Sequence, residues 1–183
     1  MEKKYQTKED LEHRFTNLLD LIDKIELSET KRTAFKTRYL DQVLWFDGHA
    51  EQTQILYYLL RLTTIVGGVL IPSLVSFYER ISWLHWVVFS VSLIVAISSA
   101  VEGFFHYGER WRNYRRTAEE LKMEGWLFIQ LAGRYGRKKY LTHEDAFPDF
   151  AGRVEDIIRQ ELNIYITQIV GEQDLEKSKK SSA

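Results

Sequence analysis

The sequence has 183 residues, contains no cysteine, and has only two prolines, Pro72 and Pro148. Without cysteine the chain has no disulfide, thiolate metal site or cysteine nucleophile. The scarcity of proline favours a mostly helical protein. The net charge is also small, −1 from 25 Lys and Arg against 26 Asp and Glu. This balance argues against bulk electrostatic binding to nucleic acid, and we expect no nucleic-acid partner.

The charges are missing from two long apolar runs. The first covers residues 62–78, and it extends back to residue 55 if the Arg61 side chain reaches the membrane interface. The second covers residues 81–101 and contains His85. A run of about 21 residues gives a helix of roughly 31 Å, which matches the hydrocarbon core of a bilayer. Buried helices of a soluble bundle are the alternative, but the second run has no polar face. The pattern predicts transmembrane helices at about 59–78 and 81–102.

The segment between these runs is too short for anything but a tight turn, so we expect a hairpin with both chain ends on one side. Four arginines follow the second run, whereas the turn carries only Arg80. By the positive-inside rule, both termini are predicted to be cytoplasmic and the protein to lie in the inner (plasma) membrane. The N-terminal residues contain no apolar run, and we expect no cleaved signal peptide. The lipid bilayer is thus the first expected partner.

Small residues recur in both apolar runs at spacings that let helices approach closely. Pro72 leaves the carbonyl of Gly68 without its helical donor and favours a bend. We take these residues as candidates for helix packing or for lining a pore: Thr63, Thr64, Gly67, Gly68, Pro72, Ser92 and Ser99.

Apolar residues at three–four spacing predict further helices outside the membrane. We expect an amphipathic helix in residues 1–27, whose apolar positions are Leu11, Phe15, Leu18, Ile22 and Ile25. Ser28 is the expected cap of the next helix, with a stripe formed by Phe35, Tyr39, Val43, Phe46 and Ala50. The second apolar helix is expected to continue unbroken to about Gly133. Residues 134–171 are predicted to form a solvated basic loop and a last helix from about Pro148, and residues 172–183 a disordered tail.

The predicted fold is an all-α membrane protein, a two-transmembrane hairpin within residues 28–133 whose long helices extend into the cytoplasm, flanked by amphipathic helices.

We find no pattern with the spacing of a catalytic site. Gly67-Gly68 lies within an apolar run and is no phosphate-binding loop. Glu102 and His106 are four residues apart, a spacing that could hold a metal or relay a proton, but we favour a polar pair at the membrane edge. His143-Glu144-Asp145 reads as the acidic first turn of a helix. We therefore expect no enzymatic activity, no catalytic residue, no metal and no cofactor.

The stretch from Trp111 to Glu124 and the segment from Tyr39 to Trp45 resemble the SLATT superfamily, bacterial two-transmembrane domains associated with SMODS nucleotidyltransferases and SLOG sensors. The nearer resemblance is to its stand-alone branch of unknown function. The family-motif positions are Trp45, Trp111, Tyr114, Arg115, Glu119, Lys122 and Glu124. The resemblance implies an effector that forms pores in the membrane and has no catalytic residues.

Two functions are consistent with these patterns. The first is a homo-oligomeric pore or ion channel, because two helices cannot enclose a pathway and several subunits would be needed, with ions as the permeant species. The second is a non-conducting anchor or scaffold, in which the cytoplasmic helices bind a partner protein.

Overall fold

A computed structural model describes residues 20–76 and 83–181. Within these ranges the chain contains helices and no strand. It divides into two compact units, one formed by Met1–Leu44 with Thr117–Ala183 and the other by Trp45–Arg116. We call them the terminal unit and the central unit and describe each by itself.

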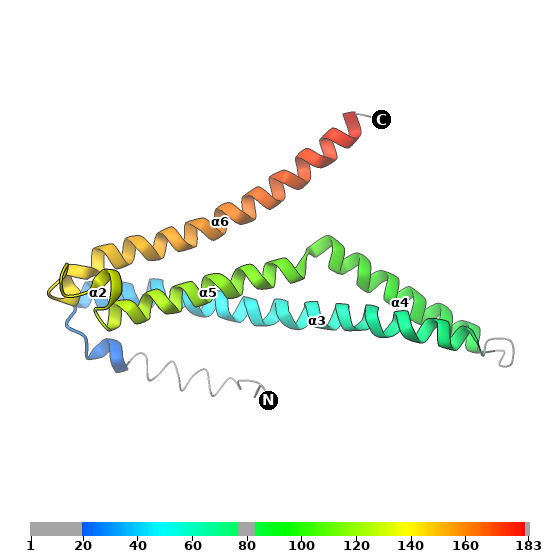
Figure 1. Ribbon diagram of the computed structural model, residues 1–183, viewed down its shortest axis with the longest axis horizontal. Helices are drawn as coiled ribbons and strands as arrows, with labels where there is room; N and C mark the ends of the chain where they lie inside the picture. Colours follow the sequence, from blue (N-terminus) through cyan, green and yellow to red (C-terminus); the bar gives the residue numbers. More distant parts are fainter. Residues whose placement is uncertain (1–19, 77–82, 182–183) are drawn as a thin grey trace. The chain divides into compact units, whose positions relative to one another are not determined.

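The helices follow one another closely along the chain (Figure 1). The first three segments, a short α-helix, a π-helical turn and a long α-helix, form one helix of 47 residues over Glu29–Val75. This length confirms the prediction that the first apolar run is the end of a much longer helix. The elements are α2 (Glu29–Ala34), η1 (Phe35–Leu40), α3 (Asp41–Val75), α4 (Leu84–Phe105), α5 (Tyr107–Ile129), the 3-10 turn η3 (Gly133–Tyr135) and α6 (His143–Ser181).

Aromatic rings form the core of the terminal unit. The Phe150 ring of α6 stacks on Phe35 of η1 and on Phe128 of α5, with centroids 5.1 and 4.4 Å apart. All three side chains are buried, as are Ile22 and Ile25.

The stripe predicted from three–four spacing is confirmed, since each of its members is buried: Phe35, Tyr39, Val43, Phe46 and Ala50. Leu11, Phe15 and Leu18 of the predicted N-terminal helix lie outside the described residues.

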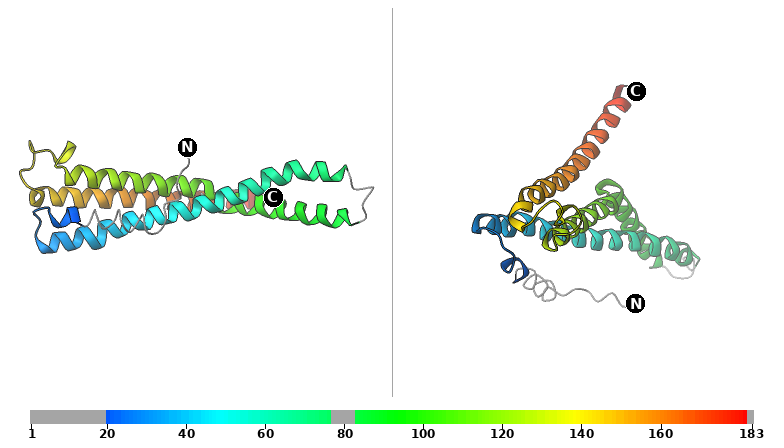
Figure 2. Two further views of the ribbon diagram at one scale, coloured as in Figure 1. Left: turned by 90° about the horizontal axis from the view of Figure 1, so that it is seen from below. Right: turned by 60° about the vertical axis from the view of Figure 1, so that its left-hand side comes forward.

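In the central unit, α3 runs antiparallel to α4 and the start of α5 (Figure 2). The contacts occur in opposite order along the two segments. Trp45 meets Tyr114 with ring centroids 5.7 Å apart, and Tyr57 stacks on Trp111 at 6.0 Å. Further along α3, Gly67 lies against Val95 of α4. Because this order is consistent at three levels, the register between the two segments is fixed along most of their length.

The prediction of an unbroken helix from the second apolar run to Gly133 is wrong. The helix α4 ends at Phe105, and His106 adopts a left-handed backbone with φ of 50° before α5 begins. Figure 1 shows the change of direction there. Gly103 and Gly108 flank the break and lower the local helix propensity, and His tolerates the left-handed region better than most residues. The apolar period continues across the break, which is why the sequence pattern did not reveal it.

The last helix also differs from the prediction at both ends. It begins at His143, before Pro148, and Glu144 and Asp145 occupy its first turn as expected. Its backbone continues through Gly171 to Ser181, so the predicted disordered tail from residue 172 is helical up to that point. A single glycine costs a helix only about 1 kcal/mol, and the residues after it include good helix formers. Residues 77, 78, 81 and 82 of the predicted transmembrane ranges lie outside the described residues.

Candidate functional site

The apolar parts of α3 and α4 are long enough to cross a membrane and lie mostly on the surface of the protein. Of the most apolar window in each helix, only 6% and 11% of the residues are buried inside the protein. The core helix of a soluble bundle would have most of such a window buried. The apolar residues of these helices therefore face outward in the isolated chain. Among them, the large exposed ones include Leu62, Val69, Phe89 and Ile97.

The two neighbouring glycines of α3 have different surroundings. A Cβ on Gly67 would collide with the Val95 side chain, so Gly67 allows α3 and α4 to approach each other. A Cβ on Gly68 would meet nothing within 4 Å. Gly108 at the start of α5 resembles Gly67, since its Cβ would lie 2.8 Å from the Tyr57 ring. Thus Gly67 and Gly108 serve packing inside the central unit, while Gly68 is exposed and has open space at the position of a Cβ.

The hydroxyl groups of α3 donate to their own helix. Thr63 Oγ1 donates to the Leu59 carbonyl at 2.8 Å, and Thr64 Oγ1 donates to the Leu60 carbonyl at 3.0 Å. After Pro72 has removed one backbone donor, Ser73 and Ser76 continue the pattern with bonds to Val69 and Pro72. Of the candidates on α4, Ser92 is half-buried and Ser99 is exposed, whereas their neighbour Ser98 is buried. The two serine candidates of α4 therefore differ in their exposure.

Four of the family-motif residues lie together in the central unit, at the end of the α3–α5 contact. Trp45 packs edge-on against Tyr114 and stacks on His49 at 4.0 Å. Beside them, Arg115 Nη1 lies 3.1 Å from Asp47 Oδ1. Trp111 contacts Tyr57 one turn closer to the apolar end. These motif residues have a structural explanation, because they join α5 to α3.

The other three motif residues belong to the terminal unit. Lys122 Nζ lies 3.5 Å from Glu119 Oε1 on the exposed side of α5. Glu124, by contrast, is buried with 2% of its surface exposed. Tyr135 Oη donates a 2.5 Å hydrogen bond to Glu124 Oε1, and Arg134 Nε lies 3.4 Å from the same oxygen. A carboxylate on a core-facing position of α5 is thus satisfied by the turn η3.

The sequence pattern missed Tyr135, which was expected to lie in a solvated basic loop. The structure buries it completely, whereas the adjacent Arg137 and Lys138 are exposed as expected. Burial, and then the hydrogen bond to Glu124, raises the pKa of Tyr135 above its ordinary value. Burial likewise raises the pKa of Tyr39, whose hydroxyl donates to the Leu121 carbonyl at 2.9 Å. Both phenols therefore stay protonated and act as hydrogen-bond donors at neutral pH.

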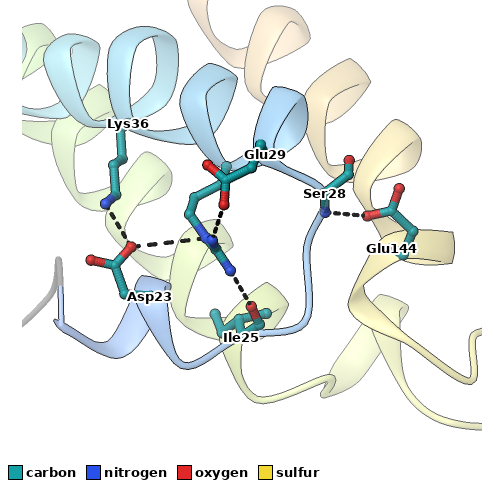
Figure 3. A network of polar contacts seen from close by, with 7 residues as sticks. Asp23, Ile25, Ser28, Glu29, Lys36 and Glu144 are labelled. Carbon is teal, nitrogen blue, oxygen red and sulfur yellow. Dashed lines mark hydrogen bonds and ion pairs between the residues drawn. The ribbon is translucent and has the colours of Figure 1, made fainter.

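A polar network joins the start of α2 to the start of α6 (Figure 3). Glu144 accepts from the Ser28 backbone N–H at 3.0 Å and lies 2.7 Å from Lys31 Nζ. Lys31 also donates to the Glu144 carbonyl at 3.0 Å, which Pro148 leaves without a helical donor. On the other side, Asp23 lies 2.6 Å from Lys36 Nζ. Ser28 occupies the expected cap position, although its hydroxyl makes no capping hydrogen bond.

In the part of the chain that the structure describes, no group of three or more His, Asp or Glu side chains could hold a metal ion. Glu102 and His106 do not sit on one continuous helix face, because His106 ends α4. Its backbone N–H donates to the Glu102 carbonyl at 3.0 Å, and its Nδ1 lies 3.2 Å from the Phe104 carbonyl. His106 is thus the C-terminal cap of α4.

The fold and these surfaces define the class, an all-helical protein with two helices long and apolar enough to cross a membrane. Within that class, the model of the family described as "Protein of unknown function (DUF4231)" matches residues 41–144, more than half of the chain. The chain belongs to this family. The matched range contains both apolar helices and every motif residue named above. No curated protein and no solved structure matches the chain.

Proposed function

We propose that this chain is an integral membrane protein whose two apolar helices form a transmembrane hairpin with both termini in the cytoplasm. The observation that carries the proposal is that only 6% and 11% of the residues in the most apolar windows of α3 and α4 are buried inside the protein. Such a surface is unfavourable in water and favourable in lipid, at about 25 cal/mol for each Å² of apolar surface removed from water. The arginines that follow α4 support a cytoplasmic position for α5, and hence a place in the inner (plasma) membrane.

Within the membrane, the hairpin assembles as a homo-oligomeric pore or ion channel. Two helices enclose no pathway, so subunits must associate. The open space at Gly68 supports this step, because Gly67 is already occupied by Val95 while Gly68 remains accessible to another helix. The resemblance to the SLATT superfamily supports the same function, since those domains are expected to form pores.

The hydroxyl geometry favours cations as the permeant ions. Thr63 and Thr64 each use their single proton for a backbone carbonyl of the same helix. Each oxygen keeps acceptor lone pairs but has no proton left to donate. Where such hydroxyls line a path they present negative partial charge, which is complementary to a cation. The absence of acidic residues from residues 62–76 argues for weak discrimination among cations.

Ion flux in liposomes reconstituted with the purified chain tests this proposal. We expect the wild type to conduct K⁺ and Gly68→Leu to insert without conducting, because leucine would take the space in which a helix of another subunit approaches. In its own chain a Cβ at this position meets nothing within 4 Å. Gly48→Leu is the matched control. It also has open space around its Cβ but lies outside the apolar run, and it should conduct like the wild type. Silence of the inserted wild type at several voltages and pH values would contradict the pore.

The second candidate function is a non-conducting scaffold whose cytoplasmic helices bind a partner protein. One observation favours it. Met123 and Trp126 lie one turn apart on α5 of the terminal unit and are 59% and 58% exposed. Exposed large side chains of this kind are typical of protein interfaces. Two results together would establish the scaffold instead of the pore. The wild type would be silent in the flux assay, and Trp126→Ala and Met123→Ala would disrupt its complex with the partner protein.

A further inference from the structure

Arginine and aromatic side chains gather in the central unit beside the apolar helices. Tyr58 and Arg61 lie on α3, and Trp111 and Arg112 lie on α5. The Tyr58 and Trp111 rings have centroids 5.7 Å apart and bridge the two helices. Arg61 follows Tyr58 by one turn of α3, and Arg112 follows Trp111 directly on α5, so the two arginines flank this ring pair. We call these four residues the headgroup patch.

The register of α3 against α4 and α5 sets the depth of this patch. Tyr57 lies against Gly108 and Gly67 lies against Val95, so Arg61 falls at the level of the last turn of α4. That turn ends in Phe104 and Phe105, and Phe104 is 76% exposed. Leu62, beside Arg61, is also exposed. In a bilayer, the guanidinium of Arg61 therefore lies where hydrocarbon gives way to headgroups, the depth that tyrosine and tryptophan prefer.

The two arginines of the patch are not neutralised by the protein. Among the residues that the structure describes, none forms an ion pair with Arg61 or Arg112. Neither Glu102 of α4 nor Glu109 of α5 serves as their partner. Arg115, a turn further along α5, shows the contrast, because it is paired with Asp47 at 3.1 Å. Both unpaired side chains are exposed and can turn toward a ligand outside the chain.

We propose that the headgroup patch binds the phosphate of an anionic phospholipid in the cytoplasmic leaflet. A guanidinium donates two parallel hydrogen bonds to a phosphate, and two unpaired guanidiniums match a lipid whose headgroup carries a net negative charge. A zwitterionic headgroup brings its own cation and gains less. The tyrosine and tryptophan rings lie beside the glycerol and upper acyl chain, where an amphipathic ring is favoured. This inference rests on membrane insertion as proposed above and is independent of whether the oligomer conducts.

Native mass spectrometry of the full chain in a non-ionic detergent tests the proposal. The protein is offered an equal mixture of phosphatidylglycerol and phosphatidylcholine, and the bound lipids are counted. We expect a preference for phosphatidylglycerol that falls about fivefold for each arginine replaced by glutamine in Arg61→Gln and Arg112→Gln. The double lysine variant keeps the charge and should retain part of the preference, which separates lipid binding from a structural effect of the substitution.

Arg137→Gln with Lys138→Gln is the matched control, since both side chains are exposed and basic but belong to the terminal unit. It should bind lipid like the wild type. An unchanged preference in the double glutamine variant would overturn the proposal. So would loss of the preference on adding excess inorganic phosphate, because the patch would then recognise free phosphate and not a lipid. Resistance of the chain to extraction from membranes by alkaline carbonate tests insertion separately, so the two failures are distinguishable.

Discussion

The hydroxyl of Tyr135 donates a 2.5 Å hydrogen bond to the buried carboxylate of Glu124, and so attaches the turn η3 to the C-terminal part of α5. A carboxylate in a core needs donors, because the cost of leaving it without them is several times that of a neutral group. Arg134 adds an ion pair, with its Nε 3.4 Å from the same Glu124 oxygen. The pairing explains why a motif glutamate can occupy a core-facing position of a helix.

Replacement of Tyr135 by phenylalanine should destabilise the terminal unit. The ring packing would stay, but Glu124 would lose its closest donor, at a cost of about 1–3 kcal/mol. Chemical denaturation of the purified chain in detergent, followed by circular dichroism, measures the change. Tyr140→Phe is the control. It removes a hydroxyl that bonds to exposed Asp149, and we expect a change within about 0.5 kcal/mol. Equal effects of the two substitutions would contradict the role given to Glu124.

A methyl group at Gly125 should be costly for a different reason. A Cβ there would collide with the hydroxyl of Tyr39, which is held by its hydrogen bond to the Leu121 carbonyl. We expect Gly125→Ala to destabilise the chain by about 1–3 kcal/mol. Gly152→Ala on α6 meets open space, and should stabilise the chain by about 0.5–1 kcal/mol through helix propensity. Thermal unfolding of the two variants measures both changes. A stabilised Gly125→Ala would show that the contact between Gly125 and the Tyr39 hydroxyl is not rigid.

The contact between α2 and α6 should weaken in acid. The hydrogen bond from Lys31, and then that from the Ser28 backbone, lowers the pKa of Glu144 below its ordinary value. The folded state thus favours the ionised carboxylate. Its contribution to stability is present above the ordinary carboxyl pKa and is lost as the pH falls through the lowered one. We expect the melting temperature to fall less in Glu144→Gln than in the wild type between about pH 6 and about pH 3. If the melting temperatures of Glu144→Gln and the wild type fell in parallel with pH, this would count against the linkage.

The break between α4 and α5 should be sensitive to β-branched residues. His106 has a positive φ, which costs an L-residue roughly 1–2 kcal/mol and costs a β-branched residue more. His106→Val should therefore destabilise the chain, while His106→Gly should be tolerated. Glu109→Val, at an exposed helical position of α5, controls for the change in side-chain type. If the valine variants behave alike in detergent denaturation, α4 and α5 can join as one helix.

Periodicity predicted what depends on local spacing. The stripe from Phe35 to Ala50 is buried because three–four spacing places its members on one face of a helix, whatever the partner. The same reasoning could not find the break at His106, since a sign change in one φ leaves the apolar period almost intact. Because the apolar period continues across His106, the periodicity argument predicted α4 and α5 as one helix.

The sites required information from distant residues. Gly67 and Gly68 are adjacent in the sequence, yet one is closed by Val95 and the other is open, because successive helical positions point about 100° apart. The burial of Glu124 depends on Tyr135 beyond a turn, and no spacing rule links a helix position to a loop tyrosine. Composition did indicate correctly that two helices are long and apolar enough to cross a membrane.

Cysteine labelling is the most direct test of the membrane hairpin, since the natural chain has no cysteine to interfere. Single substitutions Glu79→Cys, Val69→Cys and Lys138→Cys are exposed to a membrane-impermeant maleimide in intact spheroplasts and after lysis. We expect Glu79→Cys to react in intact cells, Lys138→Cys to react only after lysis, and Val69→Cys to react in neither. Reaction of Val69→Cys in lysed cells, or equal protection of Glu79→Cys and Lys138→Cys in intact cells, would contradict a hairpin that crosses the membrane twice.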